Sequence, residues 1–179
     1  MSHTNIEIKA RCPAPDQVRR LLLSAGADCR GIDRQTDTYF HVPDGRLKLR
    51  QGNIENALIF YRRPNQTGLK QSDVSLYRTT EDSALAEVLI SALPVLVVVQ
   101  KQREIYFLSN VKFHLDTVEG LGYFVEIEAI DADGSIGIET LRRQCESFME
   151  KLGIRRDDLI DCSYSDLLMQ KETPHETTD

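Results

Sequence analysis

Apolar and polar residues alternate along most of this 179-residue chain. Successive side chains of a β-strand point to opposite faces, so this pattern predicts strands that are half apolar and half polar. We expect eight of them, at residues 5–12, 36–42, 46–51, 57–63, 72–79, 95–108, 111–117 and 123–130. Turn signals at 43–45, 64–68 and 109–110 separate several of these strands, and such short connections favour antiparallel pairing.

Four other segments carry apolar residues at helical spacing. They lie between residues 13 and 26, 82 and 94, and 141 and 153, and from 163 onward, where Ser163 and Asp166 form a capping box. The second segment predicts a short helix that buries Leu85, Val88, Leu89 and Ala92.

About eight antiparallel strands with a few helices predict an α+β fold in which the sheet is a barrel or is strongly curved. The length suits one compact domain, which we place at residues 1–170, and the polar residues 171–179 predict a disordered tail.

The composition argues against several classes of protein. The net charge of −6 argues against a general nucleic-acid binder, and the longest apolar run, residues 92–99, is much shorter than the roughly 20 residues of a membrane span. No basic cluster followed by an apolar stretch marks a secretory signal. The four cysteines show no C-x-x-C pair, and the four histidines show no zinc spacing. We therefore expect a cytoplasmic protein with reduced thiols and no nucleic-acid or membrane partner.

Charge is also divided along the chain and among the strands. Residues 1–63 carry a balance of +4 and residues 64–179 one of −10. Five predicted strands have a charged face opposite an apolar one. The charged faces contain Glu7, Lys9 and Arg11; Arg46, Lys48 and Arg50; Lys101 and Arg103; Lys112, His114 and Asp116; and Glu126 and Glu128.

Two arrangements explain these faces. In an open sheet the charged faces lie in water and the apolar faces form the core. In a closed sheet the apolar faces pack outward under the helices, and the charged faces line an interior that needs a charged ligand because unpaired buried charge is costly. A polyphosphate would suit the lysines and arginines, and Mg²⁺ bridging phosphates would suit the glutamates. A lipocalin-like carrier fits poorly, since this interior is charged rather than apolar.

The same residues resemble the motifs of the CYTH family, which includes class IV adenylyl cyclases and thiamine triphosphatases. N-I-E-I-K at 5–9 resembles the family signature E-x-E-x-K. Further matches follow in family order: G-R-L-K-L-R at 45–50, Q-K-Q-R-E-I-Y-F at 100–107, F-H-L-D at 113–116, E-G-L-G-Y-F-V-E-I-E at 119–128 and S-Y-S-D-L-L at 163–168. Each motif is short, but the ordered set covers nearly the whole chain.

The resemblance implies a triphosphate tunnel, an antiparallel closed β-barrel of about eight strands with helices packed outside. Carried over by position, the phosphate-binding residues would be Lys9, Arg46, Lys48, Arg50, Lys101 and Arg103. The ligands of a Mg²⁺ or Mn²⁺ cofactor would be Glu7, Glu126 and Glu128, with Asp116 assisting. The resemblance assigns no catalytic residue.

The implied function is binding of an organic triphosphate, ATP or thiamine triphosphate, with a divalent metal. We put first an adenylyl-cyclase-like enzyme that converts ATP to cyclic AMP and pyrophosphate. A metal-dependent triphosphatase and a non-catalytic polyphosphate-binding module stay open, as does a homodimer. Two departures bear on this choice, because Asn5 replaces the first signature glutamate and Tyr61 stands where the family tends to have a lysine.

Three smaller signals have two explanations each. His114 could shuttle protons near Asp116 or be a hydrogen-bonded structural residue. Tyr39 could face a ligand or pack in the core. The segment D-A-D-G at 131–134 resembles the start of a calcium loop but lacks the later ligands, which favours a turn before the third helix.

Overall fold

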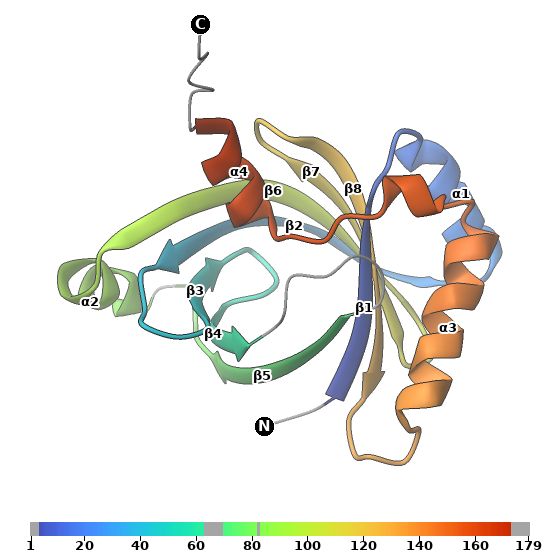
Figure 1. Ribbon diagram of the computed structural model, residues 1–179, viewed down its shortest axis with the longest axis horizontal. Helices are drawn as coiled ribbons and strands as arrows, with labels where there is room; N and C mark the ends of the chain where they lie inside the picture. Colours follow the sequence, from blue (N-terminus) through green and yellow to red (C-terminus); the bar gives the residue numbers. More distant parts are fainter. Residues whose placement is uncertain (1–3, 63–69, 82, 173–179) are drawn as a thin grey trace, which may run out of the picture.

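The computed structural model describes residues 4–62, 70–81 and 83–172 (Figure 1). Within them the chain forms eight strands: β1 Thr4–Arg11, β2 Asp28–Phe40, β3 Arg46–Gln51, β4 Ala57–Arg62, β5 Lys70–Arg78, β6 Val95–Leu108, β7 Val111–Val118 and β8 Gly122–Asp131. The helices of the same residues are α1 Pro15–Ser24, α2 Leu85–Ala92, α3 Ile138–Lys151 and α4 Tyr164–Glu172, with a short 3₁₀ turn at Arg156–Asp158.

The strands form one antiparallel closed barrel in the order β1-β5-β4-β3-β2-β6-β7-β8. The first strand closes it, since β1 pairs with β8 along eight residue positions and with β5 along four. Figure 1 shows the strongly curled strands, with the helices outside them. The predicted α+β barrel is confirmed.

One strand is much longer than predicted. The sequence pattern places it at 36–42, whereas β2 begins at Asp28 and ends at Phe40. The added part was missed because its inward positions are polar, and Asp33 and Gln35 are almost completely buried there. Alternation of apolar and polar residues therefore does not mark this strand.

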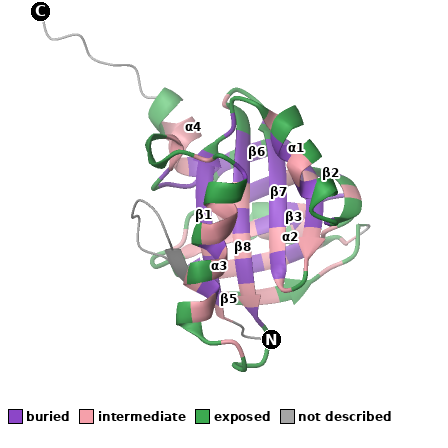
Figure 2. Cartoon of the chain, turned by 90° about the vertical axis from the view of Figure 1, so that its right-hand side faces the viewer, coloured by how far each residue is buried: buried purple, intermediate pink, exposed green. Residues whose placement is uncertain are grey.

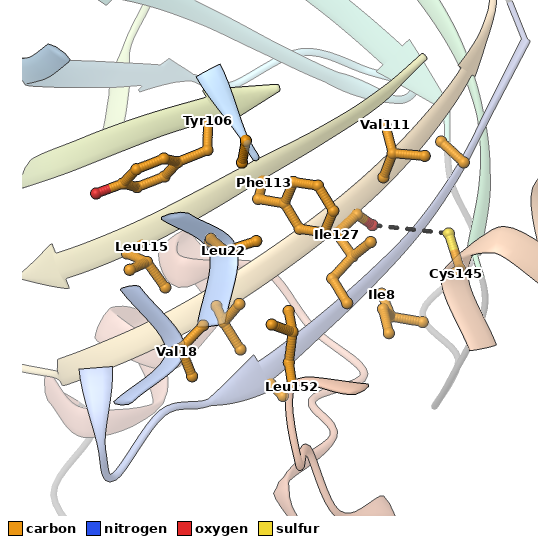
Figure 3. Close-up of a cluster of buried hydrophobic side chains, with 14 of the residues drawn as sticks. Ile8, Val18, Leu22, Tyr106, Val111, Phe113, Leu115, Ile127, Cys145 and Leu152 are labelled. Atoms are coloured by element: carbon orange, nitrogen blue, oxygen red, sulfur yellow. Dashed lines mark hydrogen bonds between the residues drawn. The ribbon is translucent and has the colours of Figure 1, made fainter. Parts of the chain in front are cut away.

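The main hydrophobic core lies outside the barrel, between the sheet and two helices. Figure 2 shows α1 and α3 over the buried faces of β1, β7 and β8, and Figure 3 shows the side chains that pack between them. Its fully buried residues include Ile6, Phe113, Ile127, Leu141 and Cys145. The Cys145 thiol donates a hydrogen bond to the backbone oxygen of Ile6 at 3.3 Å. The predicted apolar stripe of the third helix thus faces the core.

Replacing Leu141 by alanine is expected to lower the free energy of unfolding by about 2–5 kcal/mol, because it leaves a cavity under α3. Urea denaturation measures the change. Leu23→Ala on α1 is the matched control, since Leu23 is 50% exposed and its loss removes little buried surface. Equal effects of the two substitutions would contradict the packing described for α3.

The expectation that the second helix buries an apolar stripe is wrong. No residue of α2 is buried, and Val88 and Ile90 are 60% and 55% exposed. The helix lies between β5 and β6 in the chain and away from α1, α3 and α4 (Figure 1), and none of the hydrophobic clusters formed by the described residues includes a residue of it.

The fourth helix packs against one end of the barrel. Tyr164 joins a buried cluster with Val97 and Val99 of β6 and Phe124 of β8. The predicted capping box is present, because the backbone N–H of Ser163 donates to Asp166 at 2.9 Å and that of Asp166 donates to the Ser163 hydroxyl at 3.2 Å. The helix continues to residue 172, so the first two residues of the predicted tail are helical, and 173–179 lie outside the described residues. None of the helices in the described part of the chain is long and apolar enough to span a membrane.

Candidate functional site

The barrel encloses a cavity of about 530 Å³ that is lined by residues from all eight strands and by Tyr164 of α4. Its lining includes seven cationic side chains, Lys9, Lys48, Arg50, Arg78, Lys101, Arg103 and Lys112, and five carboxylates, Glu7, Asp37, Glu55, Glu126 and Glu128. The lining thus has two more cationic than anionic side chains, in a protein whose net charge is −6, and such a lining would favour an anionic ligand.

Five of the six residues expected to bind phosphate line this cavity. They are Lys9, Lys48, Arg50, Lys101 and Arg103. The sixth, Arg46, lines a separate small pocket beside α4, where its guanidinium donates to Asp166 at 2.9 Å. The structure therefore brings five of them together and places Arg46 apart.

Asp37 organises three of these cations. It is 1% exposed and accepts hydrogen bonds from Lys101 at 2.6 Å, from Lys48 at 3.1 Å and from the Arg50 guanidinium at 2.8 and 3.0 Å. Burial alone would raise the pKa of Asp37, but the charges of Arg50, Lys101 and Lys48 outweigh it and hold the pKa well below its usual range. The carboxylate thus fixes the direction of three side chains that would otherwise repel one another.

Sequence reasoning missed Asp37 and a second carboxylate, Glu55. Glu55 accepts hydrogen bonds from Arg50 at 3.0 Å and from Lys112. It is positioned by Asp33, which accepts the backbone N–H groups of Ile54 and Glu55, each at 2.9 Å. Asp37 could have been found, since it shares a strand face with Tyr39, whereas Glu55 lies in a loop where no strand pattern applies.

A second cluster surrounds Arg103. Its guanidinium binds both oxygens of Asp116, one at 2.7 Å, and also donates to Glu126 at 2.9 Å. The Tyr164 hydroxyl donates to Asp116 at 2.7 Å, and the Lys9 ammonium lies 3.8 Å from the centre of the Tyr164 ring. Asp116, expected to assist a metal, therefore has both oxygens bound by Arg103 and Tyr164.

Glu126 is also surrounded by cations. Besides Arg103 it contacts Lys9 at 2.9 Å and the Nδ1 atom of His114 at 3.0 Å. Burial lowers the pKa of His114, and the positive charges of Arg103 and Lys112 lower it further. His114 thus bonds to Glu126 rather than to Asp116, the neighbour expected from sequence.

Glu7 and Glu128 form the remaining acidic region, directly opposite each other on β1 and β8. Like charges in such a cross-strand pair repel, which a cation between them would relieve. Asn5 donates to Glu128 at 2.5 Å, and its amide oxygen is buried without a hydrogen-bond partner among the described residues. Carboxylate and amide oxygens are ligands that Mg²⁺ and Mn²⁺ prefer. Asn5, Glu7 and Glu128 therefore fit a divalent cation, although residues 4–62, 70–81 and 83–172 contain no preformed group of three metal-binding acids, histidines or cysteines.

Burial lowers the pKa of two lysines of the cavity, Lys48 and Lys101. Loss of water lowers the pKa of Lys101 to about 7, despite the nearby charge of Asp37, and Arg50, Arg103 and Lys48 lower it as well. The pKa of Lys48 is lowered mainly by the same desolvation.

Two other sequence signals had two explanations each. Tyr39 fits both of its explanations, since it lines the cavity and also packs in the cluster under α4. Asp131 accepts backbone N–H groups of the turn that follows it, at Gly134 and Gly137.

A family model described as the CYTH domain matches residues 3–164. A Methanocaldococcus jannaschii protein named "Putative adenylate cyclase MJ0240" is 28% identical over 139 residues, which are 76% of each chain. The solved structure of the PH1012 protein of Pyrococcus horikoshii superposes with a TM-score of 0.74 at 26% identity, covering 91% of this chain and 98% of that one. HpAC1 of Hippeastrum, described as a putative adenylyl cyclase with a dominant triphosphatase activity, has a TM-score of 0.64 at 15% identity and covers 99% of this chain and 100% of its own.

Proposed function

The chain belongs to the CYTH family, and on that premise we propose that it binds an organic triphosphate with a divalent cation inside the barrel and acts as an adenylyl-cyclase-like enzyme. The observation that supports this most directly is the cationic cavity, in which five side chains from β1, β3 and β6 face carboxylates of β1 and β8. A triphosphate chelated to a cation is the ligand that complements both regions.

The cations would hold the phosphate oxygens. Lys48, Arg50 and Lys101 are fixed by Asp37, and Arg103 is fixed by Asp116, so they need little reorganisation when an anion binds. The planar fork of an arginine suits two phosphate oxygens, whereas a lysine supplies a concentrated charge. These side chains would stabilise the negative charge that develops on the leaving group.

Asn5, Glu7 and Glu128 would hold Mg²⁺ or Mn²⁺. A bound cation would neutralise phosphate charge and polarise a phosphoryl oxygen. Glu126, also expected as a ligand, contributes to the cation cluster through Lys9, Arg103 and His114, and we assign it to positioning those groups.

In the cyclase reaction the 3′-oxygen of ATP forms a bond to the α-phosphorus, the bond between the α-phosphorus and the bridging oxygen breaks, and pyrophosphate leaves with the electron pair. The hydroxyl proton passes to water. The same lining would also support attack of water on the terminal phosphorus, the reaction class of the triphosphatase activity described for HpAC1. The two reactions differ in their products, so one assay separates them.

The test combines binding with product analysis. We expect ATP with Mg²⁺ or Mn²⁺ to raise the melting temperature, and cyclic AMP and pyrophosphate to accumulate. EDTA and Glu7→Gln should abolish both products, whereas Glu87→Gln on the exposed helix α2 should change nothing. Release of free phosphate would favour the hydrolase, stabilisation without product would favour a binding module, and no stabilisation by any triphosphate would contradict the proposal.

Lys48→Met is expected to weaken triphosphate binding about 10- to 100-fold, because a hydrogen bond to a charged group contributes roughly 1.5–3 kcal/mol. The fold should persist, since Asp37 keeps its contacts with Arg50 and Lys101. Isothermal titration with tripolyphosphate measures the affinity. Unchanged affinity in a folded variant would remove Lys48 from the binding site.

Affinity should also depend on pH. With the pKa of Lys101 near 7, raising the pH from 6 to 8 removes its proton in the free protein and should weaken anion binding by about tenfold. Of the charged groups around it, Asp37, Arg50 and Arg103 keep their charge over this range, whereas burial lowers the pKa of Lys48 as well. Lys101→Arg stays protonated, so its affinity should fall less between pH 6 and pH 8 than that of the wild type. Identical profiles for the two proteins would contradict the prediction.

A further inference from the structure

One wall of the cavity is apolar. Ala57, Ile59 and Tyr61 of β4 and Val74 and Leu76 of β5 form one hydrophobic cluster, and all five line the cavity. We call these five residues the apolar wall. Its three β4 residues are buried, and Val74 and Leu76 are partly exposed.

The apolar wall lies directly beside the cationic strand. In the barrel, Lys48 of β3 is opposite Ile59 of β4, and Ile59 is opposite Leu76 of β5. In the next row Arg50 is opposite Ala57. Side chains in such cross-strand positions are about 5 Å apart at their Cβ atoms. A phosphate group held by Lys48 and Arg50 would therefore lie beside this apolar surface.

The one polar side-chain group of the apolar wall is the Tyr61 hydroxyl, which is hydrogen-bonded to Arg46. Arg78, at the end of β5, also lines the cavity and is exposed. The amide of Asn56 is used within its own loop, since it donates to the Gly52 carbonyl at 2.7 Å and accepts the Gly52 N–H at 3.0 Å. Recognition here can come from removal of apolar surface from water. Phe107 and Ile130, from β6 and β8, also line the cavity and add apolar surface.

We propose that the apolar wall holds the organic group of the ligand by apolar contact, so that triphosphates with a large apolar or aromatic organic group are preferred over those with a small one. This inference rests on the proposed function, because it takes the adjacent cations as the phosphate site. It adds the class of organic group and predicts little discrimination between nucleobases.

The test compares phenyl triphosphate with methyl triphosphate, which carry the same charge and differ in apolar surface. By isothermal titration in the presence of Mg²⁺, phenyl triphosphate should bind at least tenfold more tightly. ATP and CTP should bind within about threefold of each other, since a difference below 1 kcal/mol is expected without base-specific hydrogen bonds. Equal affinities for the phenyl and methyl compounds would overturn the inference.

Substitutions in β5 test whether the apolar wall causes the difference in affinity between phenyl and methyl triphosphate. Leu76→Asn should bring the phenyl-to-methyl ratio close to one and leave the affinity for methyl triphosphate unchanged, whereas Leu76→Met should keep the ratio. Tyr77→Asn is the control on the outer face of the same strand, where Tyr77 is 69% exposed. An unchanged ratio in folded Leu76→Asn would also overturn the inference. If Leu76→Asn does not fold, the ratio in the wild-type protein still decides. Failure of both compounds and of tripolyphosphate to bind would count against the proposed function instead.

Discussion

Replacing Asp37 by asparagine is expected to lower the free energy of unfolding by about 3–5 kcal/mol, one of the two largest effects we foresee. The amide keeps the shape of the side chain but removes the charge that binds Lys48, Arg50 and Lys101. Without that charge the pKa of Lys101 would fall further, so this lysine would lose its proton at pH 7, and the buried guanidinium of Arg50 would lose its main carboxylate partner. Urea denaturation at pH 7 measures the change.

The matched control is Asp28→Asn. Asp28 is paired with Arg30 on the surface, where both side chains are about 60% exposed, and such pairs contribute little. We expect a change below about 0.5 kcal/mol. A similarly small change for Asp37→Asn would mean that the cations of the barrel do not depend on this carboxylate.

The second large effect is expected for Arg103→Met, which should lower the free energy of unfolding by about 3–5 kcal/mol at pH 7. Burial raises the pKa of Asp116, and in the native protein the charge and hydrogen bonds of Arg103 outweigh that effect, so the pKa is lowered. The stability from this pair is therefore present above the usual pKa near 4 and is lost as the pH falls through the lowered value.

Removing Arg103 reverses the direction in which the ionisation of Asp116 makes stability depend on pH. Burial then raises the pKa of Asp116 above that of the unfolded chain, so the variant loses stability as the pH rises through the raised value. We expect the difference from wild type to be larger at pH 7 than at pH 4.5. Arg62→Met is the control, since Arg62 and Asp44 form an exposed pair. A difference that does not vary with pH would show that the substitution acts through packing alone.

Much of the fold could be predicted because alternation reports which face of a strand is buried. Lys9, Arg50, Arg103 and Glu126 come from different strands, and their periodicity alone indicated that they share one side of the sheet. The same signal failed for the start of β2, where Asp33 and Gln35 point inward and polar residues occupy both faces. It also failed for α2, because spacing shows that a helix has an apolar stripe but not whether another element covers it.

The site was predicted less completely. Sequence shows which residue types face the interior, but it does not show which of them neutralise one another. Asp116 and Glu126 have the chemistry of metal ligands, yet both are bound by Arg103 in the folded chain. Arg46 lies on the same strand face as Lys48, and its place at the end of the barrel beside Asp166 decides its partner. These outcomes depend on distances across the barrel, which no local pattern contains.

Closure of the barrel by β1 also determines when this protein can complete its fold during synthesis. The most extensive pairing of β1 is with β8, and the paired residues are far apart in the sequence. Asn5 and Glu128, for example, are 123 positions apart. Most of the polypeptide must therefore emerge from the ribosome before the barrel can close. Until then Lys9 cannot form its ion pair with Glu126. Contacts of such sequence separation fold on the scale of milliseconds to seconds rather than microseconds. We expect the emerging N-terminal strand to remain a target for chaperones until synthesis has passed β8.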